Sequence, residues 1–283
     1  MNTSLLILAA GMSSRMKASS SKQIEYKKLH QANTRSKGLI EIGTDSKPLI
    51  YYLLFKAQQA GYKTIYLITG KDSSLFRRII KGFSDLNHLQ IKYITQHIPS
   101  TRAKPWGTAD AVFQALEQFP NLKKEYFSVC NSDNLYSVKA FQNIKEIEGG
   151  GALIAYDMDF LKFTKKKISG FALLVFDLNF NLQEIIEKPN PDDFKNYLDS
   201  KGCLYVSMNL FTFSGDQFYS FLKECPVHQT RNEKELPSAI LNMVHASPGS
   251  VIGIPMQEHV PDLTNKEDIL HFENHLKDLN FLN

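Results

Sequence analysis

Cysteine is scarce in this chain of 283 residues, which holds only Cys130, Cys203 and Cys225. An odd number of cysteines at these spacings fits neither a disulfide framework nor a cysteine-based metal site. The eight histidines show no metal-ligand spacing, and no set of three residues is arranged for nucleophilic catalysis. A reducing compartment, the cytoplasm, is therefore the simplest location for the protein.

Long hydrophobic runs are also missing. The first apolar stretch, residues 5–10, is too short for a signal peptide or a membrane helix, and no basic segment precedes it. We therefore expect a soluble protein that is not exported and that has no membrane partner.

Concentrated charge, repeats and linkers are absent too. The formal net charge is +4, and the lysines and arginines are spread along the chain. This argues against nucleic acid as the main partner and for anionic small molecules. No internal repeat and no proline- or serine-rich linker divides the sequence, so a single domain is expected over residues 1–283. Glycines 149–151 separate a first half, 1–148, from a second half, 149–283.

The most informative stretch is the first one. An apolar run, residues 5–8, ends in Ala9, Ala10 and Gly11 and is followed by Arg15. The run is typical of a buried parallel strand, and the small residues after it let the backbone approach a ligand closely. Free N–H groups in such a loop, with the planar guanidinium of Arg15, would suit a phosphate. The alternative is an ordinary strand-to-helix turn with a surface arginine.

Apolar residues then alternate between strand and helix spacing. Strands are predicted at 64–69, 89–94, 127–130, 152–157, 168–176, 182–186, 206–213 and 251–255. Helices are predicted at 49–60, 75–83, 218–222, 236–244 and 266–279. The alternation favours an α/β fold, a three-layer α/β/α sandwich around a mostly parallel, Rossmann-like sheet. Residues 17–37 are predicted to be an extended, mobile loop and residues 162–167 a solvated one.

Two further polar segments follow predicted strands. Gln96 offers the donor and the acceptor that a base edge requires, and Gly107 with Thr108 begins a helix whose free N–H groups can bind a base or a phosphate. The alternative is a helix that Thr108 caps, and both interpretations can hold together. Asp133 lies just past a strand end, where a doubly wound sheet places catalytic groups and where a carboxylate suits Mg²⁺. Its alternative is a cap or a turn residue.

Residues 8–16, Leu-Ala-Ala-Gly-Met-Ser-Ser-Arg-Met, resemble the opening motif of the nucleotidyltransferases that make nucleoside-diphosphate sugars and related activated alcohols. Further segments that resemble this family follow in its order: Gln96 with residues 104–111, Asn131-Ser-Asp133, Glu187-Lys188-Pro189, residues 206–213 and residues 260–268. The resemblance spans nearly the whole chain and implies the nucleotide-diphospho-sugar transferase type of fold.

The resemblance also implies roles for single residues. Nucleotide binding would fall to Leu8, Ala9, Ala10, Gly11, Gln96, Gly107 and Thr108. The triphosphate would be held by Arg15 and by a lysine, for which Lys37 is favoured and Lys22 is the other candidate. The acceptor would be bound by Asn131, Gly170, Glu187, Lys188 and Asn209. Asp133 and Asp262 would hold Mg²⁺, although this chain lacks the tryptophan that the family often has before the second aspartate.

The implied reaction is nucleotidyl transfer from a nucleoside triphosphate to a phosphorylated small molecule, with release of pyrophosphate. A sugar 1-phosphate is the favoured acceptor and a phosphorylated amino alcohol is another; the base is not specified, and a homo-oligomer is left open. Two alternatives remain. A glycosyltransferase would need a better metal motif than Asn131-Ser-Asp133, and the opening motif argues against it. A nucleotide-binding module without turnover would fit the long 17–37 segment and the missing tryptophan.

Overall fold

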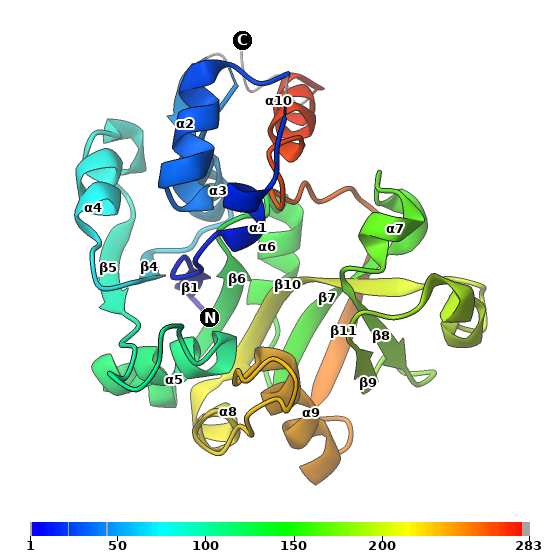
Figure 1. Ribbon diagram of the computed structural model, residues 1–283. Helices are drawn as coiled ribbons and strands as arrows, with labels where there is room; N and C mark the ends of the chain where they lie inside the picture. The colour runs from blue at the N-terminus through cyan, green and yellow to red at the C-terminus, as the bar shows by residue number, and fades with distance from the viewer. Residues whose placement is uncertain (1, 22, 44, 279–283) are drawn as a thin grey trace.

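The computed structural model describes residues 2–21, 23–43 and 45–278 of the protein. These residues form one nine-stranded sheet, whose main path follows the order β11-β7-β10-β6-β1-β4-β5 (Figure 1). The strands of this sheet are β1 (Ser4–Leu8), β4 (Thr64–Thr69), β5 (Gln90–Thr95), β6 (Tyr126–Asn131), β7 (Gly151–Asp157), β8 (Ala172–Phe176), β9 (Leu182–Ile186), β10 (Tyr205–Ser214) and β11 (Val251–Met256). A separate two-stranded sheet pairs β2 (Glu41–Ile42) with β3 (Lys47–Pro48).

The sheet is mostly parallel, as predicted. Strand β1 pairs in parallel with β4 and β6, β4 with β5, and β7 with β11. Strand β10 runs antiparallel between β6 and β7, and the β8–β9 hairpin pairs antiparallel with the first residues of β10. The carboxyl ends of β1, β4, β5 and β6 therefore meet at one edge, beside the amino-terminal part of β10.

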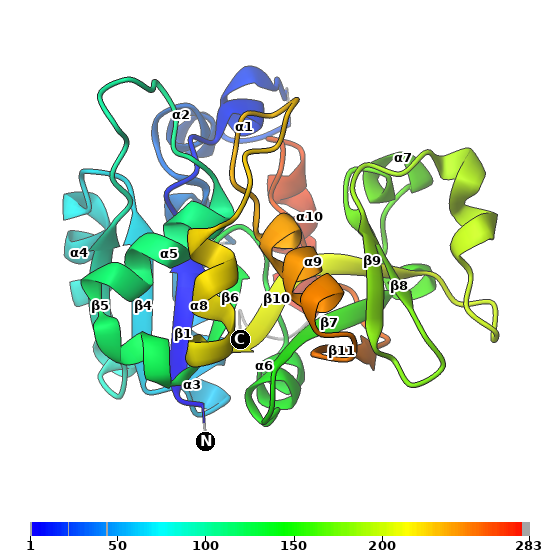
Figure 2. The ribbon, with the colours of Figure 1, turned by 90° about the horizontal axis from the view of Figure 1, so that it is seen from below.

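Helices cover both faces of the sheet, which confirms the three-layer arrangement (Figure 2). They are α1 (Ser14–Ala18), α2 (Tyr26–Thr34), α3 (Leu49–Gln59), α4 (Ser74–Lys81), α5 (Thr108–Gln118), α6 (Val138–Lys145), α7 (Lys165–Ile168), α8 (Gly215–Lys223), α9 (Leu236–Ala246) and α10 (Asp268–Asp278). Short 3₁₀ segments are η1 (Lys37–Leu39), η2 (Ser84–Leu86), η3 (Pro120–Lys124), η4 (Met158–Phe160) and η5 (Pro191–Tyr197).

The buried side chains form two cores, one on each face of the sheet. Leu5 and Ile7 belong to the core under α3, α6 and α10, whereas Leu6 belongs to the core under α5, α8 and α9. Successive side chains of a strand point to opposite faces, so a fully apolar strand serves both cores. Among the described residues, no helix has the length and hydrophobicity that a membrane crossing requires.

Two loop predictions were wrong. Residues 17–37 are not an extended loop, because they contain the end of α1 and the whole of α2. Polar long-range contacts hold α2 in place: the Gln31 side-chain oxygen accepts from the Glu41 N–H at 2.8 Å, and the Lys28 ammonium donates to the Gly43 carbonyl at 3.2 Å. Residues 162–167 are not merely solvated either, because they run into α7, and the side chain of Lys167 turns inward.

Candidate active site

The first part of the site is the loop between β1 and α1. The Ala9 N–H donates to the Ile68 carbonyl at 2.8 Å, which continues the β1–β4 pairing by one residue. Beyond it, the N–H groups of residues 10–13 donate no hydrogen bond within the described chain. A Cβ placed on Gly11 would meet nothing within 4 Å, so the space in front of this loop is open. The loop therefore offers a row of free N–H donors to an anion.

Lys37 and Asp133 form an ion pair beside this loop. Strand β6 lies next to β1 with Asn131 opposite Leu8, so the residues that follow β6 emerge beside the loop that follows β1. The ammonium of Lys37 lies 2.8 Å from the Asp133 carboxylate, and Lys37 is only 9% exposed. The structure thus brings together the favoured lysine and the first predicted metal ligand. The other candidate, Lys22, lies outside the described residues.

Gln96, Gly107 and Thr108 form the opposite wall. The Gln96 side-chain amide donates to the Gly107 carbonyl at 2.9 Å and to the Asp110 carboxylate at 3.1 Å, which leaves its oxygen for a ligand. Helix α5 begins at Thr108, as predicted, with Gly107 in the cap position. The alternative in which Thr108 is the cap was wrong, because its hydroxyl accepts from the Leu236 N–H at 2.8 Å instead.

These elements surround a cleft of about 430 Å³. Of the predicted residues, the cleft is lined by Leu8, Ala9, Ala10, Gly11, Arg15, Lys37, Gln96, Gly107, Thr108, Asn131 and Asp133. Asn131, predicted for the acceptor, thus lines the same cleft as the predicted nucleotide-binding residues.

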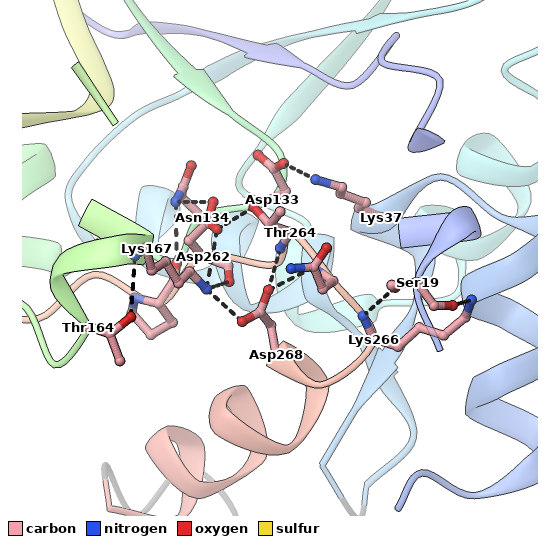
Figure 3. Close-up of polar contacts among 12 residues, drawn as sticks. Ser19, Lys37, Asp133, Asn134, Thr164, Lys167, Asp262, Thr264, Lys266 and Asp268 are labelled. Atoms are coloured by element: carbon pink, nitrogen blue, oxygen red, sulfur yellow. Dashed lines mark hydrogen bonds and ion pairs between the residues drawn. The ribbon is translucent and has the colours of Figure 1, made fainter. Parts of the chain in front are cut away.

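Asp262 lies next to Asp133 in the segment between β11 and α10 (Figure 3). A β-bridge joins Asn134 to Asp262, and the Leu263 N–H donates to the Asp133 carbonyl at 2.8 Å. Asp262 is 8% exposed and accepts from the Thr264 hydroxyl at 2.5 Å. Burial, and after it the nearby Asp133 carboxylate, raises the pKa of Asp262 above its ordinary value.

Lys167 provides the opposite charge for Asp262. Its ammonium lies 3.5 Å from the Asp262 carboxylate and 2.5 Å from that of Asp268, and it donates to the Asp262 carbonyl at 3.2 Å (Figure 3). Each predicted metal carboxylate is therefore paired with a lysine, Asp133 with Lys37 and Asp262 with Lys167. No feature of the sequence singles out Lys167, which stands in a run of three similar lysines.

The closing segment is also tied to the first loop. The Lys266 ammonium donates to the carbonyl of Lys17, at 3.0 Å, and to that of Ser19. The backbone N–H of Lys266 donates to the Ser19 hydroxyl at 3.0 Å (Figure 3). Lys266 is 3% exposed. It links the segment that carries Asp262 to the end of α1, which carries Arg15, and it too was missed by sequence reasoning.

A larger cavity, of about 740 Å³, lies between α7 and α10. Three of the predicted acceptor residues line neither this cavity nor the cleft. Glu187 pairs with Arg231 at 2.9 Å. Lys188 is exposed and has a φ of 50°, so it lies in a left-handed turn at the end of β9. Asn209 has a φ of 59° and lies where the register between β10 and β7 shifts. The fourth, Gly170, lines the larger cavity together with Arg15 and Asp262.

The donor set at the two aspartates fits a magnesium ion. Asp133 and Asp262 supply carboxylate oxygens from neighbouring segments, and the ion characteristically takes one or two carboxylates together with water and substrate phosphates. No group of three or more histidine, cysteine or acidic side chains that could hold a metal comes together in the part of the chain that the structure describes, so the protein would supply only these two carboxylates. Two carboxylates suit an ion whose other ligands are water and phosphate oxygens.

Comparison with known proteins identifies the class. Residues 32–250 match the model of a family described as nucleotidyl transferase, which covers more than half of the chain. The chain belongs to this nucleotidyl transferase family. That confirms the family that the sequence motifs indicated.

Similar curated proteins are glucose-1-phosphate adenylyltransferases. The one from Corynebacterium kroppenstedtii is 28% identical over 200 residues, covering 67% of this chain and 46% of the relative. The one from Paraburkholderia phytofirmans is 26% identical over 198 residues, covering 68% and 46%. The chain thus spans about half the length of the curated relatives that it matches.

A solved structure of UDP-glucose pyrophosphorylase complexed with UDP-glucose is similar in fold. It matches with a TM-score of 0.73 at 16% identity, and the match covers 99% of this chain and 100% of that chain. The predicted nucleotide-diphospho-sugar transferase type of fold is therefore confirmed.

Proposed function

We propose that the protein transfers a nucleotidyl group from a nucleoside triphosphate to a phosphorylated small molecule, in a reaction that depends on Mg²⁺ and releases pyrophosphate. A sugar 1-phosphate is the favoured acceptor, since the curated relatives are glucose-1-phosphate adenylyltransferases. The observation that carries the proposal is the row of unused N–H groups at residues 10–13, beside the Lys37–Asp133 pair.

The triphosphate would lie against the loop that follows β1. The free N–H groups, Arg15 and Lys37 would bind its phosphate oxygens, and these fixed donors need little rearrangement when the transferred group becomes more negative. The base would lie toward Gln96, whose side-chain oxygen can accept from an amino or imino group.

The acceptor phosphate needs no general base, because its oxygen is already ionised at neutral pH. That oxygen attacks the α-phosphorus in line, a new P–O bond forms, and the bond to the β-phosphate oxygen breaks so that pyrophosphate leaves. The protein contributes positioning and neutralisation of charge. Mg²⁺, held by Asp133 and Asp262, would supply further neutralisation of the phosphate oxygens. Lys37, now paired with Asp133, would be free to turn toward the nucleotide once another cation takes its place.

The setting of this reaction is also part of the proposal. Cys130 and Cys225 are buried free thiols, and Cys203 is a partly exposed one, which accords with a reducing cytoplasm. The partners would be the two small-molecule substrates, with neither nucleic acid nor a membrane involved. A homo-oligomer would be compatible with the proposed reaction.

A pyrophosphate-release assay tests the proposal. The four common nucleoside triphosphates are crossed with a panel of sugar 1-phosphates and phosphorylated alcohols, with and without Mg²⁺. We expect release with one pairing, abolished by Asp133→Ala and by chelation. The matched control is Asp192→Ala, which removes an exposed carboxylate that has no hydrogen bond or ion pair among the described residues. Nucleotide binding without Mg²⁺-dependent release for any pairing would instead support the binding-module alternative.

A further inference from the structure

One segment of the second half, residues 226–235 between α8 and α9, reaches the nucleotide cleft. Figure 2 shows this segment in gold, rising from α8 toward the carboxyl edge of the parallel strands and returning to α9. Glu233 from this segment lines the cleft. So do Gln96, Gly107 and Lys104 from the first half of the chain. No sequence motif singled out Glu233, so its presence in the cleft is new information from the fold.

The backbone on both sides of Glu233 is held by the segment that leads into α5. Before it, the Asn232 carbonyl accepts from the Arg102 guanidinium at 2.7 Å. After it, the Lys234 carbonyl accepts from the Ala109 N–H at 3.0 Å. A side chain whose backbone is fixed on both sides is presented to a ligand in a defined position. Glu233 is therefore a built part of the cleft wall.

Gly107 lies between Glu233 and Gln96. A Cβ on Gly107 would lie 3.1 Å from the Cβ of Glu233, so the two segments touch at this point. The Gly107 carbonyl accepts from the Gln96 side-chain amide at 2.9 Å. The side chains of Glu233 and Gln96 therefore both lie beside Gly107, at the end of the cleft where the base is proposed to lie.

Two charged groups at this end of the cleft have no partner. The Glu233 carboxylate and the Lys104 ammonium make no hydrogen bond or ion pair with the residues that the structure describes. The amide group of Gln96 already donates to Gly107 and to Asp110, which leaves its oxygen as an acceptor. The base end of the cleft thus offers a carboxylate, an amide oxygen and one cation.

Among the four common bases, guanine alone presents two adjacent donors to a carboxylate. Its N1–H and N2–H₂ lie side by side and can bind both oxygens of one carboxylate, while its O6 and N7 accept from a lysine. Adenine and cytosine place an unprotonated ring nitrogen beside the amino group, and uracil places carbonyls on both sides of its N3–H. With these three bases a lone pair would face one of the carboxylate oxygens.

We propose that Glu233 sets the base specificity of the cleft and selects a guanine nucleotide. Its carboxylate accepts from N1–H and N2–H₂, the Gln96 oxygen accepts the second N2 hydrogen, and Lys104 donates to the O6 and N7 edge. A nucleotide in this cleft is part of the proposed function, and the choice of guanine by Glu233 is the step beyond it.

The first experiment compares GTP with inosine triphosphate, which differs from GTP only in lacking the 2-amino group. Calorimetry with Mg²⁺ and without acceptor measures binding. We expect the unaltered protein to bind GTP at least about 10-fold more tightly than inosine triphosphate, ATP, CTP or UTP. Because Glu233 makes no contact in the described chain, Glu233→Gln breaks none. This variant should lose at least about 10-fold in GTP affinity, and its ratio of GTP to inosine triphosphate affinity should fall at least about fivefold.

The matched control is Glu224→Gln, which alters an exposed glutamate at the end of α8 outside the cleft lining. Both affinities should stay within about twofold of the unaltered protein in this control, since it touches no base contact. A loss in Glu233→Gln that is equal for GTP and inosine triphosphate would overturn base selection, because a disturbed segment weakens all nucleotides alike. Thermal melting monitors folding.

Lys104→Met tests the other edge of the base. GTP and inosine triphosphate share O6 and N7, so this variant should weaken both by a similar factor and keep their affinity ratio within about twofold. Its control is Lys71→Met, which alters an exposed lysine outside the cleft lining. An unchanged GTP affinity in Lys104→Met would overturn the role given to Lys104.

The outcomes separate base selection from the proposed function. Preference for another base, or equal affinity for GTP and inosine triphosphate in the unaltered protein, overturns the selection of guanine. The proposed function still stands in that case if any nucleotide gives Mg²⁺-dependent pyrophosphate release. Selective GTP binding that depends on Glu233, without pyrophosphate release with any acceptor, upholds base selection and contradicts the proposed function. Failure to bind any nucleotide overturns both.

Discussion

Lys37 has two roles in the proposed mechanism, one toward Asp133 and one toward the nucleotide. Its ammonium neutralises the aspartate at 2.8 Å in the absence of a nucleotide, and in the proposed reaction it binds the triphosphate. Lys37→Met should lower kcat/KM for the nucleotide by about 100-fold, the scale of losing one charged group that stabilises a transition state. Steady-state kinetics measures this. The control Lys27→Met removes an exposed lysine that pairs with Glu41, and an equal loss in that variant would contradict a specific role.

The charged carboxylate of Asp262 should lower the stability of the folded protein at neutral pH, although the proposed metal site requires it. Because burial raises its pKa, the folded state binds its proton more tightly than the unfolded chain does. Its contribution to stability is therefore present at low pH and is lost as the pH rises through the ordinary carboxyl range toward the raised pKa. Asp262→Asn, which keeps the shape and removes the charge, should melt at a higher temperature than the unaltered protein at neutral pH.

The difference in melting temperature should shrink as the pH falls below about 4, where the carboxyl is protonated in both states. Mg²⁺-dependent activity should fall by at least about 100-fold in the same variant. Melting curves across pH together with the pyrophosphate assay check both parts. A lower melting temperature at neutral pH would show that the pairing with Lys167 outweighs the burial of the charge.

Single residues also show what the sequence leaves open. The resemblance places Asn209 at the acceptor, and its low propensity for strands required either a ligand or a backbone reason. The structure shows a backbone reason: the residue adopts a φ of 59°, which asparagine tolerates, at the irregularity between β10 and β7. The sequence does not reveal a local backbone conformation that depends on two neighbouring strands.

At the scale of elements, α1 depends on a residue far along the chain. The buried ammonium of Lys266 donates to two carbonyls at the end of this five-residue helix. Lys266→Met would leave these carbonyls without their donor. This should lower the unfolding free energy by about 1–3 kcal/mol. The nucleotide KM should also rise, because α1 carries Arg15.

The control for this variant is Lys17→Met, which removes an exposed side chain of α1 but keeps the carbonyl that Lys266 binds. Chemical denaturation and nucleotide kinetics compare the two. Equal stability and equal KM in both variants would show that Lys266 does not position α1.

Two glycines next to the cleft should respond differently to alanine. At Gly107, φ is 114° and a Cβ would lie 2.5 Å from the Lys234 carbonyl, so Gly107→Ala should cost about 1–3 kcal/mol of unfolding free energy. At Gly11 a Cβ meets nothing, so Gly11→Ala should keep its melting temperature. Nucleotide affinity should nevertheless fall, because the Cβ faces the space of the phosphates. Melting curves and calorimetry test this, and a destabilised Gly11→Ala would contradict it.

Strands were easier to predict than short helices. The strands at 64–69 and 182–186 agree with β4 and β9, since continuous or alternating apolar residues mark a buried strand. Helix α2 was missed because it buries only Gln31 and Ala32, so no apolar stripe marks it. Its position depends on polar contacts with Glu41 and Gly43, and such contacts leave no periodic signal in the sequence.

At the scale of the whole molecule, the parallel sheet explains why much of the cleft could be predicted. Residues that follow β1, β5 and β6 meet at one edge because the carboxyl ends of parallel strands lie together. Position along the chain therefore located Gly11, Gln96 and Asp133. The same logic could not locate Lys167, because α7 and the segment that carries Asp262 are far apart in the sequence of the second half and meet only in the folded chain.

The two halves of the chain share one sheet, and this bears on the prediction of a single domain. Strand β10 from the second half lies between β6 of the first half and β7, and the Asn2 side chain donates to the Ser128 and Thr212 hydroxyls. The halves should therefore unfold together, because neither can keep its sheet neighbours alone. Calorimetry should show one transition with a calorimetric to van't Hoff enthalpy ratio of about 1.

A protease site inserted between Gly149 and Gly150 extends this test. The fragment of residues 1–149 released by cleavage would expose the edge of β6 that β10 covers, together with Phe127 and Val129, both fully buried in the intact chain. We expect this fragment to aggregate or to show no cooperative melting, and the cleaved but unseparated protein to keep its single transition. Two separate transitions, or a fragment that folds alone, would show that glycines 149–151 divide two independent domains.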